Sequence, residues 1–340
     1  MNWLSAVYAA VARTRRGYYE RRPDRQRHLQ RVVVSVGNIA VGGSGKTPAV
    51  AYIARLLVAA GERPAILTRG YRRREATERV LVASDGHRIR ADVPRAGDEP
   101  LMLARAVPEA AVLVGADRYL AGLLAERGLD CSVHLLDDGF QHVRLHRDID
   151  IVLVTPADLR DQVLPAGRLR EDLSALARAD AIVVNTNDDV DWAALAAATG
   201  ARVMFQARTR LGPVQTGLKP AKVLAVAGIA RPRRFFDLLS ASGWHVAGEL
   251  TFGDHHWFTR ADLGRIVRAA REAGADLVVT TEKDLVRLLR FRPFPVPIAA
   301  VPLEMRIDLP VPARAGALPF GEWLAARLAA IRAAAPVERA

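Results

Sequence analysis

The chain has 340 residues, half of them hydrophobic, and a formal net charge of +12. A chain of this length suits two domains with cores of ordinary size. The single cysteine, Cys131, excludes an internal disulfide and suits a reducing compartment, and we expect it to fill core space. The positive charge favours an anionic partner, which is a nucleic acid, an acidic membrane surface or a phosphorylated substrate.

The chain opens with an apolar stretch that is followed by a cluster of arginines. Residues 1–12 are too few to span a bilayer, and the charges follow them rather than precede them, which is wrong for a signal peptide. A short apolar helix joined to the Arg-rich residues 13–22 is suited to lying on an anionic membrane. A helix packed on its own domain with a solvated basic tail fits the same pattern, and the two interpretations are compatible. We assign residues 1–30 as an amphipathic membrane-contacting segment.

A glycine-rich turn lies between an expected buried strand, 31–36, and an expected helix, 49–60. Backbone N–H groups of such a turn face a phosphate, the Lys of Gly-Lys-Thr reaches the β- and γ-phosphates, and the Thr can hold Mg²⁺. The usual pattern has Gly five residues before Gly-Lys-Thr, where this chain has Ala. A turn that merely packs strand on helix is therefore the alternative. The predicted nucleotide-binding residues are Ala40, Val41, Gly42, Gly43, Ser44, Gly45, Lys46 and Thr47.

Lysine is rare in this arginine-rich chain, so its positions are informative. Among 49 basic residues, lysine stands only at 46, 219, 222 and 283. A compact ammonium on a flexible stem contacts phosphate in a way that a planar guanidinium does not. This supports a phosphate-binding role for Lys46 and makes Lys283 a second candidate.

Apolar runs alternate with helical patterns, which predicts a parallel sheet with crossover helices. A cluster of Gly and Pro at 212–220 predicts a linker, after which a second alternating unit begins. The predicted class is α/β, a P-loop NTPase-like α/β/α sandwich with a second, smaller α/β domain. The nucleotide-binding domain is expected over 31–211 and the second domain over 221–340. Strands beyond the first are expected at 64–68, 111–114, 132–136, 149–154, 181–185, 202–206, 246–252, 277–280 and 297–301, and a strand followed by a turn at 222–230. Further helices are expected at 117–127, 232–242, 260–273 and 320–334.

Two adjacent acids, Asp137 and Asp138, follow the expected strand 132–136. Carboxylates at the carboxyl end of a strand beside a phosphate loop complete a P-loop site by holding Mg²⁺. Adjacent side chains of an extended chain point to different sides, so we expect one of the two to contact the metal directly and the other to act through water or to hold a neighbouring group. A pair of acids that caps the next element is the alternative.

Phosphoryl transfer to a hydroxyl also needs a group that accepts its proton, and two segments offer candidates. The acid pair of Gly97-Asp-Glu-Pro100 is, taken by itself, typical of a helix N-cap. The Gly253-Asp-His-His-Trp257 segment offers a His beside an Asp, which can orient a base, although ordinary polar loop structure produces the same pattern.

The order of these segments resembles the tetraacyldisaccharide 4′-kinase family. The resemblance rests on the phosphate loop and on further short motifs, of which Asp-Asp-Gly-Phe-Gln-His and Thr-Glu-Lys-Asp are the most specific. The other matching segments are 68–71, 97–100, 117–118, 164–165, 167–171 and 254–255. Ala40 matches the family's own form of the loop. The chain departs from the family at Asp172, where the family commonly has Pro.

The resemblance implies two α/β/α domains and transfer of the γ-phosphate of ATP to the 4′-hydroxyl of a tetraacylated glucosamine disaccharide 1-phosphate, a lipid A precursor. It implies a peripheral enzyme at the cytoplasmic face of the bacterial inner membrane, with ATP and Mg²⁺ as cofactors. It further implies Asp98 as general base with His255 as its partner, Lys46 and Thr47 on phosphate and Mg²⁺, and Asp137, Asp138 and Gln141 around the metal. Candidates for the substrate's 1-phosphate or the ATP phosphates are Arg69, Arg118 and Arg170.

Two other functions are compatible with parts of the sequence. A P-loop switch or regulator at the membrane surface would use Lys46, Thr47 and Asp138 but has no need of Asp98. A nucleic-acid-binding ATPase would fit the charge, but aromatic residues make up only 6% of the chain and the arginine cluster is terminal. We therefore expect no nucleic-acid partner, and no obligate protein partner is evident.

Overall fold

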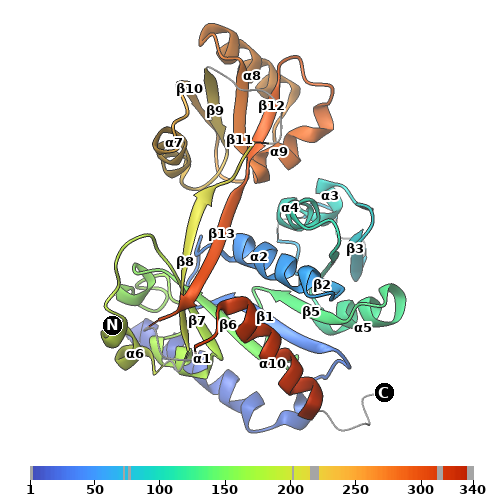
Figure 1. Cartoon of the computed structure of the whole chain (residues 1–340), viewed down its shortest axis with the longest axis vertical. Coiled ribbons are helices and arrows are strands. Elements are labelled where there is room, and N and C mark those ends of the chain that lie inside the picture. Colours follow the sequence, from blue (N-terminus) through green and yellow to red (C-terminus); the bar gives the residue numbers. More distant parts are fainter. Residues whose placement is uncertain are drawn as a thin grey trace. The chain divides into compact units, whose positions relative to one another are not determined.

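The computed structural model describes residues 3–71, 73–75, 78–200, 203–214, 222–311 and 317–334. The chain divides into two compact units (Figure 1), one made of 1–209 with 305–340 and the other of 210–304. Most of the expected linker, 215–220, lies outside the described residues.

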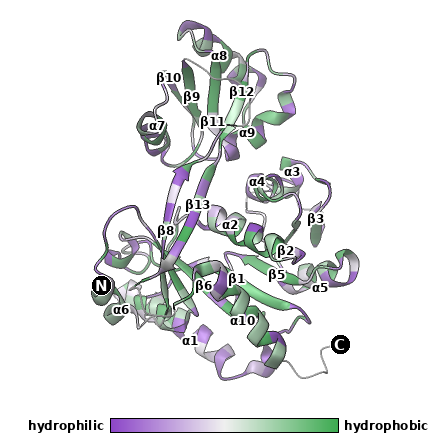
Figure 2. Cartoon of the chain, in the orientation of Figure 1, coloured by the Kyte–Doolittle hydropathy of each residue, from purple (hydrophilic) through white to green (hydrophobic). Residues whose placement is uncertain are grey.

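The first unit is built on a nine-stranded sheet with the order β13-β8-β7-β6-β1-β5-β2-β4-β3. From β8 to β4 the neighbouring strands are parallel, and β3 is antiparallel to β4. The strands are β1 (Val32–Asn38), β2 (Pro64–Thr68), β3 (Val80–Asp85), β4 (Ala111–Gly115), β5 (Val133–Asp137), β6 (Ile149–Val154), β7 (Ala181–Asn185), β8 (Met204–Leu211) and β13 (Leu303–Pro310). All residues of β1 and β6 are buried, as the continuous apolar runs predict, and Figure 2 shows these strands in the hydrophobic colour.

Helices follow most of these strands, as crossover connections between parallel strands require. Helix α2 packs on β1, β2 and β5, and α5 packs on β2 and β4. Cys131 is buried beside α5, as expected. The helices of this unit are α1 (Trp3–Glu20), α2 (Lys46–Ala59), α3 (Val93–Ala96), α4 (Asp98–Ala106), α5 (Arg118–Leu129), α6 (Trp192–Thr199) and α10 (Phe320–Ala334), with short 3₁₀ turns η1 (Pro23–Arg25), η2 (Asp158–Arg160) and η3 (Leu173–Arg178).

The C-terminal segment differs from the sequence-based boundary, which placed all of 221–340 in the second domain. Residues 305–340 group with the first unit. The physical reason is aromatic packing of α10, because Phe320 is fully buried between Tyr52 and Phe205, with ring centroids 6.3 and 5.1 Å away. In addition, β13 lies beside β8 in the large sheet, a strand that the sequence reading missed.

The second unit contains a four-stranded parallel sheet with the order β10-β9-β11-β12. The helix at 282–288 was not expected from the sequence, whereas the strands and the other two helices of this unit agree closely with the expected ones. In chain order, the elements are β9 (Val223–Ala227), α7 (Pro232–Ala241), β10 (Val246–Thr251), α8 (Arg260–Glu272), β11 (Leu277–Thr281), α9 (Glu282–Leu288), η4 (Leu289–Phe291) and β12 (Ile298–Val301).

Helix α1 has one buried face and one exposed apolar face. Ser5, Ala9 and Arg16 are buried, whereas the Trp3 and Val11 side chains are 73% and 63% exposed. The helix therefore packs on its own unit, as one interpretation of the N-terminal pattern predicts, and it also presents apolar residues to the surroundings. Contact of this helix with a membrane stays a prediction. Within the part of the chain that the structure describes, no helix combines the length and the hydropathy that crossing a bilayer requires.

Candidate active site

The glycine-rich turn joins β1 to α2, and α2 begins at Lys46, three residues earlier than expected. Gly42 and Gly45 have φ angles of +117° and +90°, which side chains rarely adopt. A Cβ atom at Gly42 or Gly43 would meet nothing within 4 Å, so the turn faces open space. At Gly45 a Cβ would lie 2.5 Å from the Asn185 amide, so only glycine fits there.

Two asparagines fix the shape of this turn. The Asn38 amide donates hydrogen bonds to the Ala40 carbonyl (2.6 Å) and to the Ser44 hydroxyl (3.0 Å). The Asn185 amide donates to the Ser44 carbonyl at 3.0 Å. The turn is thus held open before any ligand enters, which is the preorganisation that a phosphate cradle needs.

Lys46 lies beside one of the two predicted metal ligands. Its Nζ is 3.5 Å from Asp138 Oδ1, and Arg170 Nη1 donates to Asp138 Oδ2 at 2.9 Å. Burial raises the pKa of Asp138, but Lys46 and Arg170 together outweigh it, and the pKa lies below its usual value. Asp138 is therefore an anion at neutral pH. Gln141 belongs to the same cluster, because its Oε1 accepts a longer bond (3.4 Å) from Arg170.

Asp137 has a different environment, as adjacent positions on an extended chain predict. It pairs with Val36 across β5 and β1, which places it next to the strand that leads into the turn. Its side chain is 6% exposed and accepts a hydrogen bond from Thr68 Oγ1 at 3.0 Å. Burial, with the nearby Glu99 and Asp138, raises the pKa of Asp137 to about 6.

The two carboxylates fit a divalent cation. Asp138 Oδ1 is buried and, apart from the Lys46 ammonium at 3.5 Å, has no hydrogen-bond partner among the described residues. A cation would also relieve the cost of ionising Asp137. In the described ranges, no group of three or more His, Cys, Asp or Glu side chains is arranged to hold a metal ion by itself. The remaining ligands would then be Thr47, Gln141, nucleotide phosphate oxygens and water, which suits Mg²⁺.

Asp137 should also make stability depend on pH. Because its pKa of about 6 exceeds its usual value near 4, the folded state binds more protons than the unfolded state between these values. The free energy of unfolding should therefore decrease as pH rises through this interval, by up to about 3 kcal/mol from this group. In urea titrations with EDTA, Asp137→Asn should be more stable than the wild type at pH 8 and no more stable at pH 4. A stability difference that does not change with pH would contradict this.

Two of the three predicted substrate arginines lie at the carboxyl ends of neighbouring strands. Arg69 follows β2, and Arg118 begins α5 after β4. Arg118 is 6% exposed and donates to the carbonyls of Gly115 (3.3 Å) and Ala116 (3.0 Å), while its Nε is buried and makes no hydrogen bond within the described part of the chain. Burial lowers the pKa of Arg118, the Arg69 charge lowers it further, and Asp137 opposes both. The carboxyl edge of the sheet thus carries both cations and acids.

Asp98 is the first residue of α4 and is 6% exposed. Its Oδ1 accepts a hydrogen bond from the Glu99 backbone N–H at 2.9 Å. His255 belongs to the second unit, so the pairing of Asp98 with His255 stays a prediction.

His255 lies against the Thr-Glu-Lys-Asp segment. Its φ angle is +58°, and its Nε2 is 3.2 Å from Lys283 Nζ. Its Nδ1 is 3.3 Å from Arg287 Nη2, and Arg287 in turn pairs with the fully buried Asp284 at 3.0 Å. The structure therefore joins two of the family motifs, 254–255 and 281–284, into one cluster with Lys283.

Sequence reasoning missed several residues that support the site. Asn38 and Thr68 stand in segments that carried the resemblance, but no role was assigned to them. Asn185 could have been found, because it is a polar residue at the carboxyl end of a buried strand, where α/β proteins place binding groups. Arg287 could have been noticed three residues after Asp284 of the Thr-Glu-Lys-Asp motif, but its contact with His255, 32 positions earlier, had no signal in the sequence.

Comparisons with known proteins agree with the geometry. The family model described as tetraacyldisaccharide-1-P 4′-kinase matches residues 1–315. Tetraacyldisaccharide 4′-kinase of Geobacter metallireducens is 42% identical over 297 residues, which is 84% of this chain and 87% of the relative. The Geobacter sulfurreducens protein of the same name is 41% identical over 326 residues, which is 92% of this chain and 90% of the relative.

A solved structure is similar over nearly the whole length. The crystal structure of LpxK from Aquifex aeolicus in complex with ATP has a TM-score of 0.77 and 30% sequence identity, and the match covers 96% of this chain and 97% of that one. This confirms the predicted α/β fold class, and the resemblance read from the motifs is confirmed as well. The chain belongs to the tetraacyldisaccharide-1-P 4′-kinase family.

Proposed function

We propose that the chain is an ATP-dependent lipid kinase that transfers the γ-phosphoryl group of ATP to the 4′-hydroxyl of tetraacyldisaccharide 1-phosphate, forming lipid IVA in lipid A biosynthesis. Family membership supports the reaction. Within the molecule, one observation carries it: an open glycine turn, held by two asparagines, with Lys46 at its end and Asp138 3.5 Å from the ammonium.

The chain's own residues supply alignment and charge. Backbone N–H groups of 40–45 and the N-terminus of α2 would face the β- and γ-phosphates, and Lys46 would neutralise charge on them. Thr47, Asp137, Asp138 and Gln141 would hold Mg²⁺, which neutralises charge on the phosphates when bound. Such preorganised charge, together with in-line positioning, is the main source of catalysis in phosphoryl transfer.

Asp98 is the proposed general base. A sugar hydroxyl is a poor nucleophile, and a positioned carboxylate that takes its proton assists the attack. The low exposure of Asp98 and its place at a helix N-terminus support a fixed orientation. His255 is its proposed partner, and Arg69, Arg118 and Arg170 are the proposed contacts for the substrate's 1-phosphate or the ATP phosphates.

The proposed location is the cytoplasmic face of the bacterial inner membrane, with α1 resting on anionic lipid. The exposed apolar side of α1, with Trp3, Val7 and Val11, supports this, as does the arginine cluster that follows. Such seating would keep the acyl chains of the substrate in the bilayer while the sugar reaches the site.

Removing apolar area from α1 should weaken membrane binding. Val7→Ser combined with Val11→Ser is expected to reduce the affinity for vesicles that contain an anionic phospholipid by about tenfold, because apolar burial in the interface is lost. Vesicle co-sedimentation measures this, and Leu124→Ser on α5, where Leu124 is 38% exposed, is the control. Equal losses in both variants, or no loss in the first, would contradict the assignment of α1 as the membrane-contacting element.

The test of the proposed function is direct. Purified protein is incubated with ATP, Mg²⁺ and tetraacyldisaccharide 1-phosphate, and the lipid product is analysed by mass spectrometry. We expect a second phosphate on the lipid, absent when ATP is omitted. ATP hydrolysis without any phosphorylated lipid would overturn the proposal and favour the switch.

A further inference from the structure

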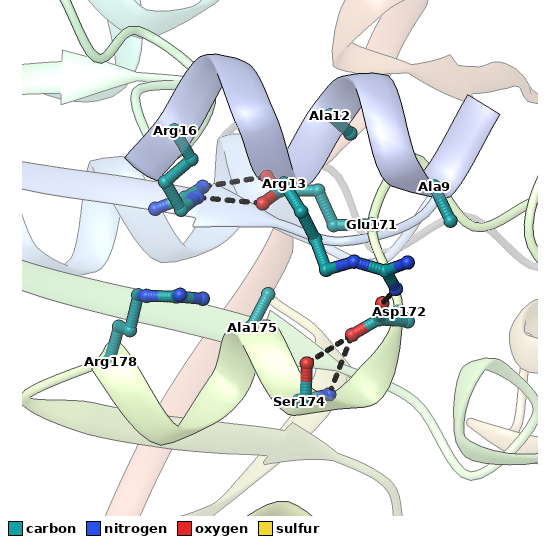
Figure 3. A pocket seen from close by; sticks show the side chains of 9 residues that line it. All are labelled: Ala9, Ala12, Arg13, Arg16, Glu171, Asp172, Ser174, Ala175 and Arg178. Carbon is teal, nitrogen blue, oxygen red and sulfur yellow. Dashed lines mark hydrogen bonds and ion pairs between the residues drawn. The ribbon is translucent and has the colours of Figure 1, made fainter. Parts of the chain in front are cut away.

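The buried face of α1 ends in a charged residue, Arg16, which has no role in the kinase site as described above. Ser5, Ala9 and Arg16 lie at spacings of four and seven, so they share one side of the helix. On this side Ser5 Oγ donates to the Val163 carbonyl at 2.9 Å. Figure 3 shows the same side facing η3 and the acids before it, across a small cavity. The helix therefore uses opposite faces for its apolar exposed residues and for Arg16.

Arg16 is a buried charge with three specific contacts. Its guanidinium is 4% exposed and forms a two-point pair with Glu171, Nε to Oε2 at 2.7 Å and Nη2 to Oε1 at 2.6 Å. Nη2 also donates to the Phe140 carbonyl at 2.9 Å, and the guanidinium lies 4.2 Å from the Phe140 ring centroid. Removing a guanidinium from water is unfavourable unless its geometry is this well satisfied, so the contact fixes both partners.

Glu171 connects Arg16 to the residues around Asp138. Glu171 Oε1 also accepts a hydrogen bond from Gln141 Nε2 at 3.0 Å, and the same amide donates to the Asn38 carbonyl at 2.9 Å. The next residue in the chain, Arg170, donates to Asp138 Oδ2. The Arg170 backbone N–H donates to the Ile39 carbonyl at 2.6 Å, so this segment lies against the start of the glycine turn.

We propose that Arg16 is a positioning residue for phosphoryl transfer. Arg16 fixes the Glu171 carboxylate, and Glu171 accepts a hydrogen bond from Gln141. Through these contacts Arg16 holds Gln141 and Arg170 in the arrangement that places Asp138 beside Lys46. Without Arg16, the Glu171 carboxylate loses the partner that fixes it, and Gln141 and the neighbouring Arg170 lose that support. The inference rests on the proposed kinase function and assigns Arg16 no contact with substrate.

The chain offers a matched control on the same helix. Arg13 Nη1 pairs with Asp172 Oδ2 at 2.6 Å, and Figure 3 shows this pair beside the Arg16–Glu171 pair. Asp172 otherwise accepts hydrogen bonds from Ser174 at the start of η3. Arg13 is thus, like Arg16, an arginine of α1 that pairs with an acid, and the two acids are consecutive in the chain. The partner of Arg13 contacts η3, whereas the partner of Arg16 contacts residues around Asp138.

The experiment compares Arg16→Met with Arg13→Met in the full-length protein. Binding of a non-hydrolysable MgATP analogue is measured by calorimetry, and kcat and the two KM values by lipid phosphorylation. Arg16→Met should weaken analogue binding and lower kcat, each by about tenfold or more, as loss of residues that orient metal ligands does. The KM of Arg16→Met for the lipid should stay within about twofold of that of Arg13→Met, and Arg13→Met should match the wild type in analogue binding and in kcat. Arg16→Lys keeps the charge but cannot form the two-point pair, so its analogue affinity and kcat should lie between those of the wild type and those of Arg16→Met.

Folding is controlled by melting temperature and by a second variant, Arg16→Met combined with Glu171→Met, which removes both buried charges. If the single variant unfolds, the folded double variant carries the comparison. Low kcat and weak analogue binding in it support the inference, and wild-type values overturn it. Equal behaviour of Arg16→Met and Arg13→Met also overturns it. Absence of lipid phosphorylation in the wild type would overturn the proposed function instead, so the two failures are distinguishable.

Discussion

Lys46→Ala is expected to lower kcat/KM for lipid phosphorylation by about a thousandfold, the loss typical of removing one preorganised charge from a transition state. The Lys46 ammonium follows directly on the glycine turn and faces the Asp138 carboxylate, so it lies where the γ-phosphoryl group would gather negative charge. Its loss should also weaken binding of MgATP, because the ground-state phosphates contact the same group.

Lys46→Arg should recover little of this loss. The guanidinium is planar and larger, and Arg170 already occupies the other side of Asp138. The matched control is Lys222→Ala, since Lys222 is an exposed lysine of the second unit whose backbone N–H donates to Asp276. The comparison requires kcat/KM for lipid phosphorylation and the melting temperature of each of the three variants. Near wild-type kcat/KM in Lys46→Ala would show that this turn is not the phosphate site.

Asp98→Asn is expected to lower kcat by a hundredfold to about ten-thousandfold while MgATP binding is kept, because general bases contribute that much to the chemical step. Asparagine keeps the size and the hydrogen-bond acceptor that the Glu99 N–H uses, so folding should be preserved. Single-turnover lipid phosphorylation and calorimetry with an ATP analogue measure the two quantities separately.

The control for this variant is Asp92→Asn. Asp92 also sits at a helix start, where its side chain caps α3 by accepting from the Arg95 N–H, and asparagine caps equally well. We expect kcat of Asp92→Asn to equal that of the wild type. Unchanged lipid phosphorylation in Asp98→Asn would remove the general-base assignment. Lost MgATP binding in the same variant would assign Asp98 to the nucleotide site.

Much of the site was predictable because its signals are local. A phosphate-binding turn is encoded in consecutive residues, 40–47, and the acids at 137–138 directly follow an apolar strand. Parallel strands bring their carboxyl ends to one edge, so the sequence alone predicts that Lys46 and Asp138 meet. The buried runs of β1 and β6 and the strands of the second unit were predictable for the same reason, since period and flanking residues decide them.

The tertiary structure decided the contacts between residues far apart in the chain. The alternating segment 303–310 reads as a strand only once β8 is beside it, and Phe320 brings α10 back to the first unit through Tyr52 and Phe205. Arg16 looked like one of many arginines in a basic cluster, although it is buried against an acid 155 positions later. The sequence determined the local elements and the phosphate turn, because backbone preference and hydrophobic period act over neighbouring residues. Which distant charges pair inside the protein was decided by packing, because only the folded chain removes them from water and requires each to have a partner.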